Sequence, residues 1–522
     1  MKHIRYPRNL FRLGLLAILC LGAGIAFVTR DAVGYQTTER ATNWIESGQG
    51  GTLPAEMDFD NPQGKLGVLN TAGPMEMKGH PFFEPLGVNP RACVTCHQPA
   101  DAMSISVETL RERWRVTKGE DPIFAAVDGS NNPKLPQALE HSHSLLLQRG
   151  LFRVGLQWPP RDKYGKAIKP EFTIEVVRDP TGVNLDADFG LQGANPTVSV
   201  FRRPRPVANL KYVMSPDDVF NIKTGTLMAT DPETGLPVSM NLMADARHLT
   251  LKQQAVGAYR DHQEGRQGLS KETVQKIVDF ENQVYVAQRF DRWGGSLIEP
   301  NGPAGLGPLA MANGKIHVLA NNNRDPVFRL FDAWKKLETM PKSLTEVQRE
   351  FRASVARGND VFMLRQFWIR DAAHINSIGL GNPIKRSCAT CHNVQMTGQD
   401  LAPGWVDVGT TNYPTWTEPS VFSEKAELPV FKCTCDKAAP PHPYLGRVIY
   451  STDPGRALIT GKCVDLGSIV MGQLRGLAAR APYFSNGSAK TLRELVDFYD
   501  RRFDMKLSEQ EKQDLVNFLS VL

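Results

Sequence analysis

The chain of 522 residues lacks several features that would mark other classes of protein. No dense Lys/Arg run or aromatic-basic patch follows the N-terminus, and the formal net charge is only +6, so nucleic acid is not an expected partner. Cysteine is scarce, at 8 residues. The 41% hydrophobic and 22% charged residues are ordinary for a globular protein, and the length allows two or three domains.

The N-terminal segment has no clear cleavage site. An apolar run, Leu13–Val28, follows a flank that contains four basic residues, which is the pattern that directs export with the N-terminus held in the cytoplasm. Because no Ala-x-Ala site follows Val28, we favour an uncleaved membrane anchor over a removed signal peptide. We therefore expect the chain on the periplasmic side of the bacterial inner membrane, anchored there, or free in the periplasm if the segment is removed.

Two short motifs are repeated far apart in the chain. Cys93–His97 reads Cys-Val-Thr-Cys-His, and Cys388–His392 reads Cys-Ala-Thr-Cys-His. This is the attachment pattern of c-type haem, in which both thiols bond to vinyl groups and the histidine binds the iron. A zinc site would need a second thiolate pair, and none flanks either motif. We predict two covalent haem c groups, attached through Cys93, Cys96, Cys388 and Cys391, with His97 and His392 as iron ligands.

The other cysteines are Cys20, inside the apolar run, and Cys433, Cys435 and Cys463. In an oxidising compartment we expect one disulfide among the last three. We favour Cys435–Cys463, because each of these two borders a Gly/Pro-rich loop. One thiol is then left over, and its partner cannot be assigned from the sequence.

Local patterns predict where several elements begin. Ser270 is expected to cap a helix, and Thr345 with Gln348 forms a capping box for a helix ending near Gly358. Ser508 with Glu511 predicts a last helix by the same pattern. The alternating segment 172–176 suggests a small hairpin. The 44 glycines and 36 prolines are spread along the chain and indicate long, irregular loops.

A resemblance rests on the two motifs and on further blocks. The segment Leu474–Ser488 contains Leu-Arg, Ala-Pro-Tyr-Phe and Asn-Gly-Ser, and weaker elements lie at 202–210, 244–247 and 254–255. These residues resemble the bacterial di-haem cytochrome c peroxidase family, which includes MauG-like proteins. The similarity is strongest from about residue 345 to 522. It implies a mainly α fold: two cytochrome c-like helical domains with loop-rich insertions and a few short strands.

The resemblance and the composition together suggest a domain plan. The expected parts are an N-terminal anchor or signal (1–30), a tether (31–79), a first haem domain with insertions (80–295), a linker (296–340) and a second haem domain (341–522).

The resemblance also implies roles for single residues. The first haem would activate peroxide, and Glu264, counted from Gln254, falls on the family's catalytic glutamate as general acid/base. His262 is the rival distal group. For the sixth ligand of the second haem the count places Tyr499 at the family's position, and Met505 is the other candidate, which we favour slightly. A bridging calcium ion is a further expectation from the family.

The sequence also departs from the family pattern. The family's tryptophan between the haems would fall at Ala244, so the usual electron relay is absent or replaced. The second motif begins 295 residues after the first, which indicates long insertions. Outside candidates for the second haem's ligand are Met471 and His442.

The function ranked first is a periplasmic di-haem peroxidase-like oxidoreductase that reduces peroxide at the first haem with electrons relayed by the second. Peroxide or oxygen would be the oxidant, and a small cytochrome or cupredoxin the electron donor. The alternatives are a non-catalytic, membrane-tethered electron-transfer cytochrome and a MauG-like or rubber-oxygenase-like oxidase of a larger substrate.

Overall fold

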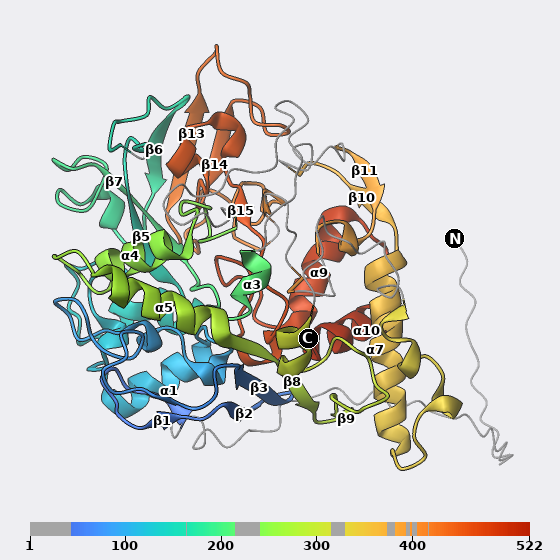
Figure 1. Cartoon of the computed structure of the whole chain (residues 1–522). Coiled ribbons are helices and arrows are strands. Elements are labelled where there is room, and N and C mark those ends of the chain that lie inside the picture. The colour runs from blue at the N-terminus through green and yellow to red at the C-terminus, as the bar shows by residue number, and fades with distance from the viewer. Residues whose placement is uncertain are drawn as a thin grey trace, which may run out of the picture. The chain divides into compact units, whose positions relative to one another are not determined.

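Groups of strands and groups of helices follow one another along the chain in the computed structural model (Figure 1). The structure describes residues 43–162, 164–214, 241–314, 329–372, 382–392, 397–398, 404–415 and 417–522.

The expectation of a mainly α fold is wrong. Helices account for 31% of the structure and strands for 19%. The strands come largely from segments that were expected to be loops or a tether, because their backbone N–H and C=O groups pair with distant segments of the chain rather than with water.

The first sheet has the strand order β2-β3-β8-β9, and each neighbouring pair is antiparallel. Its strands are β2 (Glu56–Asn61), β3 (Gly64–Asn70), β8 (Val284–Asp291) and β9 (Gly295–Ser296). In β3, Leu66 is fully buried and Val68 is nearly so. Residues 56–70 are therefore core strands and not part of a tether, a difference that arises because β8 supplies hydrogen-bonding partners from more than 200 residues away.

The second sheet, β14-β13-β6, joins two remote parts of the chain (Figure 1). Strand β6 (Phe172–Arg178) pairs antiparallel with β13 (Val430–Cys435), which also pairs with β14 (Val448–Ser451). The strand expected at 172–176 is thus present, but its partner is β13 and not a neighbouring hairpin strand.

The predicted disulfide is confirmed at the end of the central strand of this sheet. Cys435, at the end of β13, is bonded to Cys463, with a Cα–Cα distance of 5.8 Å. Cys433 is two residues earlier on β13, and it is a free, fully buried thiol. A disulfide of this kind is typical of proteins that fold in an oxidising compartment.

The remaining strands form two-stranded antiparallel pairs. These pairs are β1 (Thr52–Leu53) with β4 (Met75–Glu76), β5 (Phe152–Gln157) with β7 (Thr197–Arg202), β10 (Phe367–Ile369) with β11 (Ile384–Arg386), and β12 (Trp405–Val406) with β15 (Ile469–Val470).

Some of the helices before residue 315 begin at side-chain caps, among them the predicted cap at Ser270. Thr250 accepts a hydrogen bond from the backbone of Gln253, and Ser270 accepts one from Thr273, so each satisfies an otherwise free N–H group. The helices of this part are α1 (Val107–Thr117), α2 (Ser144–Arg149), α3 (Leu210–Val213), α4 (Leu251–His262), α5 (Lys271–Gln283) and α6 (Pro308–Asn313).

The later helices are α7 (Glu346–Leu364), α8 (Ala457–Thr460), α9 (Leu492–Phe503) and α10 (Glu509–Ser520). Both predicted capping boxes, at Thr345 and at Ser508, are present. However, α7 does not end near Gly358. A Cβ atom on Gly358 would lie 2.0 Å from the backbone oxygen of Asp514, so the glycine allows α7 and α10 to pack closely and does not terminate the helix.

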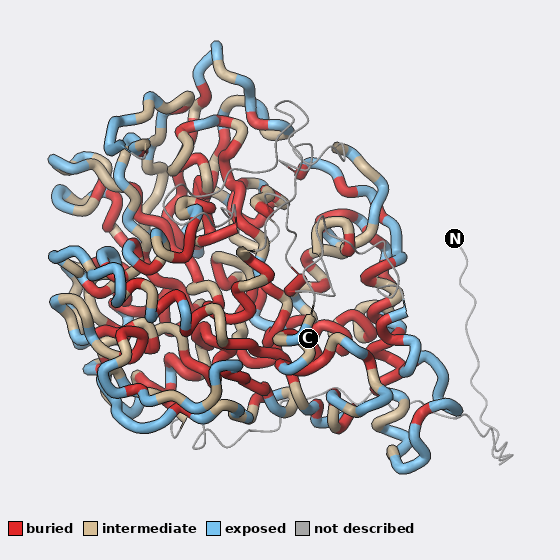
Figure 2. Tube along the Cα trace, viewed as in Figure 1, coloured by how far each residue is buried: buried red, intermediate tan, exposed pale blue. Residues whose placement is uncertain are grey.

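Buried residues follow the inner faces of these elements, and exposed residues lie along the outer loops (Figure 2). One apolar core gathers around α7, α9 and α10, and includes Phe362, Val496 and Phe518. Another gathers around β3 and α5, and includes Leu66 and Ile277. The division into two haem domains stays a prediction.

No helix in the described part of the chain is long and apolar enough to cross a membrane. The predicted anchor, residues 1–30, lies outside the described residues. The predicted localisation at the inner membrane is therefore corrected, since no described helix supports an anchor.

Candidate functional site

The two Cys-x-x-Cys-His motifs have the same local structure. Cys93–Thr95 and Cys388–Thr390 are short 3-10 helices that each begin after an extended residue. In the first motif the backbone N–H of His97 donates to the oxygen of Cys93 over 3.1 Å, and in the second that of His392 donates to Cys388 over 3.2 Å. One tight turn thus brings both thiols and the histidine to one side of the backbone.

Each motif histidine is held in the same way. The Nδ1 atom of His97 lies 3.0 Å from the backbone oxygen of Met103, and that of His392 lies 2.6 Å from the oxygen of Gly398, six positions after the histidine in both cases. Because a carbonyl oxygen only accepts, Nδ1 carries the proton and Nε2 keeps a free lone pair. Burial lowers the pKa of His97 to about 4 and also lowers that of His392, so both rings are neutral metal-ligand candidates.

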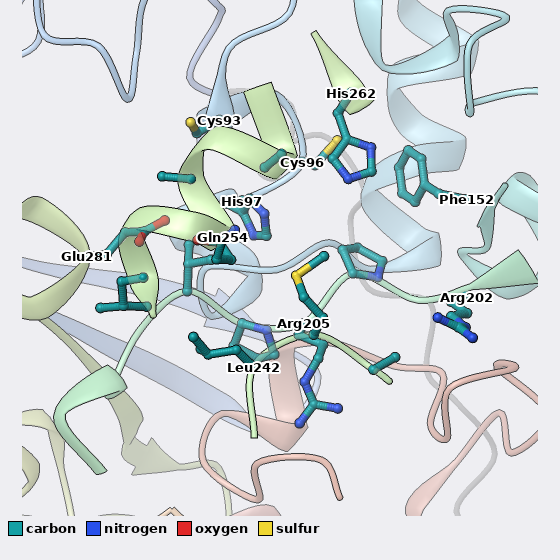
Figure 3. A pocket seen from close by; sticks show the side chains of 18 of the residues that line it. Cys93, Cys96, His97, Phe152, Arg202, Arg205, Leu242, Gln254, His262 and Glu281 are labelled. Atoms are coloured by element: carbon teal, nitrogen blue, oxygen red, sulfur yellow. The ribbon is translucent and has the colours of Figure 1, made fainter. Parts of the chain in front are cut away.

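The first motif opens on a cavity, called cavity 1 below, of about 1310 Å³ of empty space including its part open to solvent (Figure 3). Cys93, Cys96 and His97 all line it. Its other walls come from the strand pair β5-β7, from α4 and α5, and from the segment 202–207. Its lining also includes Asp128, Arg205, Ala244, Gln254, His262 and Glu281.

The second motif opens on its own cavity, cavity 2, with about 1680 Å³ of empty space including its solvent-open part. Cys388, Cys391 and His392 line it, and α9 contributes Leu495 and Tyr499 to an otherwise largely apolar wall. Met505 follows α9 and also lines cavity 2. The structure thus brings together both sixth-ligand candidates, Tyr499 and Met505, with the second motif.

The residues of both cavities fit a covalent haem. None of the four motif cysteines takes part in a disulfide within the described residues. Burial raises the pKa of Cys96 and of Cys388 to about 12, so these thiols stay protonated. Two thiols, a neutral histidine and a large apolar space are the set that haem c attachment requires.

Glu264, the predicted acid/base, lies at the edge of this arrangement. Its side chain is exposed, and it accepts a hydrogen bond from Nδ2 of Asn89 over 3.0 Å. Its backbone has a φ of +54°, outside α4, and it is not among the residues that line cavity 1. The structure therefore does not bring Glu264 together with His97.

His262, by contrast, lines cavity 1. It is the last residue of α4, and its nearness contributes to the lowered pKa of His97 after the larger effect of burial. Its Nδ1 atom lies 2.6 Å from Oδ2 of Asp128. Only Gln263 lies between His262 and Glu264, yet of these two predicted residues only His262, at the end of α4, lines cavity 1.

Asp128 is itself buried and charged. Burial disfavours its carboxylate, but the adjacent guanidinium of Arg91 and the bond to His262 outweigh burial and lower the pKa of Asp128. Arg91 is 1% exposed and donates through Nη1 to Asp128 and through Nη2 to the backbone oxygen of Ile123 over 2.7 Å. Arg91, Asp128 and His262 thus form one hydrogen-bonded chain that ends in cavity 1.

Two polar side chains that line cavity 1, Gln254 and Glu281, each have one buried oxygen that is unsatisfied among the described contacts (Figure 3). Among the described contacts, neither Oε1 of Gln254 nor Oε2 of Glu281 has a hydrogen bond, although both atoms are buried. Burial raises the pKa of Glu281 to about 8, which keeps this carboxyl largely neutral near pH 7.

Sequence reasoning missed Asp128, Arg91 and Glu281. Asp128 lies in a loop-rich insertion, and Arg91 stands just before the first motif, so neither belongs to a local pattern. Glu281 was hidden in the periodic pattern of α5. A signal for it exists in retrospect, since it falls on the same face as the buried residues Val274, Ile277 and Val278.

Comparisons with known proteins give one sequence relative of note. No protein-family model matches the chain. Cytochrome-c peroxidase IdrP1 of Pseudomonas sp. (strain SCT) is 26% identical over 149 residues, which is 26% of this chain and 37% of that relative. The match confirms the predicted resemblance, that of a divergent relative of the di-haem cytochrome c peroxidase and MauG-like family. The chain matches little more than a third of the relative's length.

A solved structure is also similar. It is the crystal structure of a MauG-like protein associated with microbial copper homeostasis, which is 17% identical and covers 79% of this chain and 88% of its own. The TM-score is 0.26, and at that value the likeness carries no argument.

Proposed function

We propose that the chain is a di-haem c-type cytochrome with peroxidase-like oxidoreductase activity, which reduces peroxide at cavity 1 with electrons relayed from cavity 2. The carrying observation is the duplicated construction: two turns of the same geometry, each with a histidine Nδ1 bonded to a carbonyl and each opening on its own cavity. The similarity to a protein named as a cytochrome-c peroxidase supports the reaction class.

Haem c, when bound, would supply a redox-active iron at each site. The chain's part is to hold and orient it. Cys93 and Cys96 would bond to the first group, and Cys388 and Cys391 to the second. The carbonyl oxygen of Met103 keeps the proton on Nδ1 of His97, so its Nε2 is available to the metal.

For proton movement in cavity 1, His262 is the better candidate than Glu264. The carboxylate of Asp128 accepts from Nδ1–H of His262, which leaves Nε2 as the basic atom of the ring. Nε2 can then take the proton of hydrogen peroxide and return it to the departing oxygen as general acid/base. Arg91 keeps Asp128 charged, and the carboxylate of Asp128 holds the ring of His262 in this orientation.

At cavity 2 the chain offers two ligands of opposite effect. The thioether of Met505 would raise the potential and favour acceptance of electrons, whereas the phenolate of Tyr499 would favour oxidised iron. A site that accepts electrons from a small cytochrome or cupredoxin and passes them on is better served by Met505. Burial raises the pKa of Tyr499 and so disfavours the phenolate.

Calcium stays a prediction of the resemblance. In the described ranges no group of three or more His, Cys, Asp or Glu side chains could hold a metal ion.

The test is to express the whole chain in a host that attaches c-type haem, and to measure covalent haem per protein and the EPR spectrum before and after stepwise reduction and addition of peroxide. We expect two haems per chain and a high-spin signal that peroxide removes. Cys93→Ala with Cys96→Ala should retain one haem and lose the peroxide response, and Cys388→Ala with Cys391→Ala should retain the other haem.

The opposite outcomes are equally definite. A chain without covalent haem overturns the proposal entirely. Two low-spin haems that ignore peroxide in every redox state overturn the peroxidase part and leave an electron-transfer cytochrome.

A further inference from the structure

Cavities 1 and 2 share a wall. Six residues line both of them: Arg203, Pro204, Arg205, Pro206, Ala244 and Gln473. We call this set the shared wall. It is built from the segment after β7 and from two loop residues, and the two prolines keep its backbone extended. A charge placed in this wall therefore acts on both cavities.

The two arginines of the shared wall donate to backbone oxygens. In Arg203, Nη2 donates to Ile105 over 2.6 Å and to Arg480 over 2.9 Å. In Arg205, Nη1 donates to Val470 over 2.9 Å and Nη2 donates to Met471. Figure 3 shows the guanidinium of Arg205 directed away from His97 and toward the C-terminal part of the chain. Among the described contacts neither arginine has a carboxylate partner.

A third cation stands beside them. Arg480 lines cavity 2, donates to the backbone oxygen of Gln473, and has a buried Nε atom without a partner among the described residues. Burial, followed by repulsion from Arg480, lowers the pKa of Arg203 to about 9 and that of Arg205 to about 10. Buried guanidinium groups of which two are repelled by the third are costly unless an anion neutralises them.

Arg202, the residue directly before the shared wall, shows the contrast. Its Nε and Nη2 atoms donate to the carboxylate of Asp453 over 2.6 and 2.9 Å, and its Nη1 donates to Asp245 over 2.5 Å. This buried cation has two carboxylates from the chain. Among the described contacts Arg203, Arg205 and Arg480 have no ion pair with a carboxylate. Asp101 attracts Arg203 and Asp245 attracts Arg205, but both effects are smaller than those of burial and of repulsion from Arg480.

We propose that Arg203, Arg205 and Arg480 form a carboxylate-binding site in the shared wall, and that its ligands are the propionate groups of the two haems. The inference rests on the proposed function and deepens it. Guanidinium groups are the side chains best suited to bind carboxylates through paired hydrogen bonds. Four propionates from two haems would place negative charge in direct contact with these guanidinium groups, which no described carboxylate of the chain does.

The site has an electrical consequence. A cation near an iron favours the reduced state, which carries one positive charge fewer. Arg203 and Arg205 line both cavities and so act on the potentials of both haems. Arg480 lines cavity 2 but not cavity 1, and it therefore acts mainly on the potential of the second haem. The family's tryptophan between the haems is replaced here by Ala244, and the shared wall instead places charged arginines between cavity 1 and cavity 2.

The experiment is a spectroelectrochemical titration of both haems in the intact chain. Arg205→Gln and Arg203→Gln should each lower both midpoint potentials, and Arg480→Gln should lower the second more than the first. Arg205→Lys, which keeps the charge, should stay closer to the unaltered protein. Arg260→Gln, which removes an exposed cation paired with Asp261 outside both cavities, should change neither potential.

Haem content is measured on each variant, which separates the two failures. If the unaltered chain carries no haem, the proposed function fails. If it carries two haems and both glutamine variants keep both potentials, or shift only one, the shared site is overturned. Should Arg205→Gln not fold, the propionate bending bands of Arg205→Lys in resonance Raman spectra decide. A shift of these bands supports the contact, and unchanged bands oppose it.

Discussion

The Nδ1 atom of His262 lies 2.6 Å from Oδ2 of Asp128, although the two residues are 134 positions apart in the chain. This contact turns a histidine at the end of α4 into an oriented base at the edge of cavity 1. It also connects the cavity to the buried Arg91, because Asp128 accepts hydrogen bonds from both side chains.

We therefore expect His262→Gln to lower kcat/KM for peroxide by about 10² to 10⁴-fold, the usual contribution of general acid/base catalysis. Asp128→Asn should lower it less, since the ring stays in place but loses its negative partner. The measurement is steady-state peroxide reduction with a reduced donor, together with the haem content and EPR spectrum. Asp261→Asn, a substitution of the exposed neighbour, is the matched control and should retain full activity. A loss in Glu264→Gln with full activity in His262→Gln would instead favour the family's pattern.

The second haem's sixth ligand can be read from the direction of its potential shift. If Met505 binds the iron, Met505→Leu lowers the midpoint potential and Tyr499→Phe changes it little. If Tyr499 binds, Tyr499→Phe raises the potential, because the oxidised state loses a phenolate. We expect the first result, measured by redox titration with absorbance detection. The control is Phe484→Leu, which removes an aromatic ring that lies against Tyr499 but leaves both candidate ligands, Tyr499 and Met505, unchanged.

Glu281 predicts a pH dependence of stability. Burial raises its pKa to about 8 from an ordinary 4.5, so between these values the folded chain keeps a proton that the unfolded chain has released. The free energy of unfolding should then fall as pH rises from about 5 to 8, by up to about 1.4 kcal/mol per pH unit from this group.

The test is denaturant unfolding across this pH range. Glu281→Gln should flatten the slope, since glutamine does not titrate. Glu272→Gln, on the exposed face of the same helix α5, should leave it unchanged. Equal slopes in the Glu281 variant and the unaltered chain would show that the pKa of Glu281 is not raised in the folded protein.

The disulfide closes a loop over a sequence separation of 28. A loop of this length predicts that Cys435→Ala with Cys463→Ala lowers the free energy of unfolding by about 3 to 4 kcal/mol under oxidising conditions. Cys433→Ala, which removes only the free buried thiol, should cost about 1 kcal/mol. Denaturant unfolding with and without a reductant checks this. If the difference between the double variant and the unaltered chain persists in reductant, it does not come from the bond.

Much of the local structure was predictable because its causes lie within a few residues. Thr345, Ser270 and Ser508 cap helices whose free N–H groups are only three residues away, so the pattern is complete in the sequence. The two Cys-x-x-Cys-His turns are equally local. The error at Gly358 is instructive, since a glycine that ends helices elsewhere here admits the backbone of α10, a contact with a helix about 150 residues later.

The sequence by itself thus determined the two Cys-x-x-Cys-His turns, the helix starts at Ser270, Thr345 and Ser508, and the pairing of Cys435 with Cys463. Only the tertiary structure decided that β6 pairs with β13, that His262 rather than Glu264 lines cavity 1, and that Arg203 and Arg205 line both cavities with no carboxylate ion pair among the described contacts. The physical reason is range. Capping and turn formation depend on neighbours along the chain, whereas strand pairing, burial and charge compensation depend on segments that meet only when the chain packs.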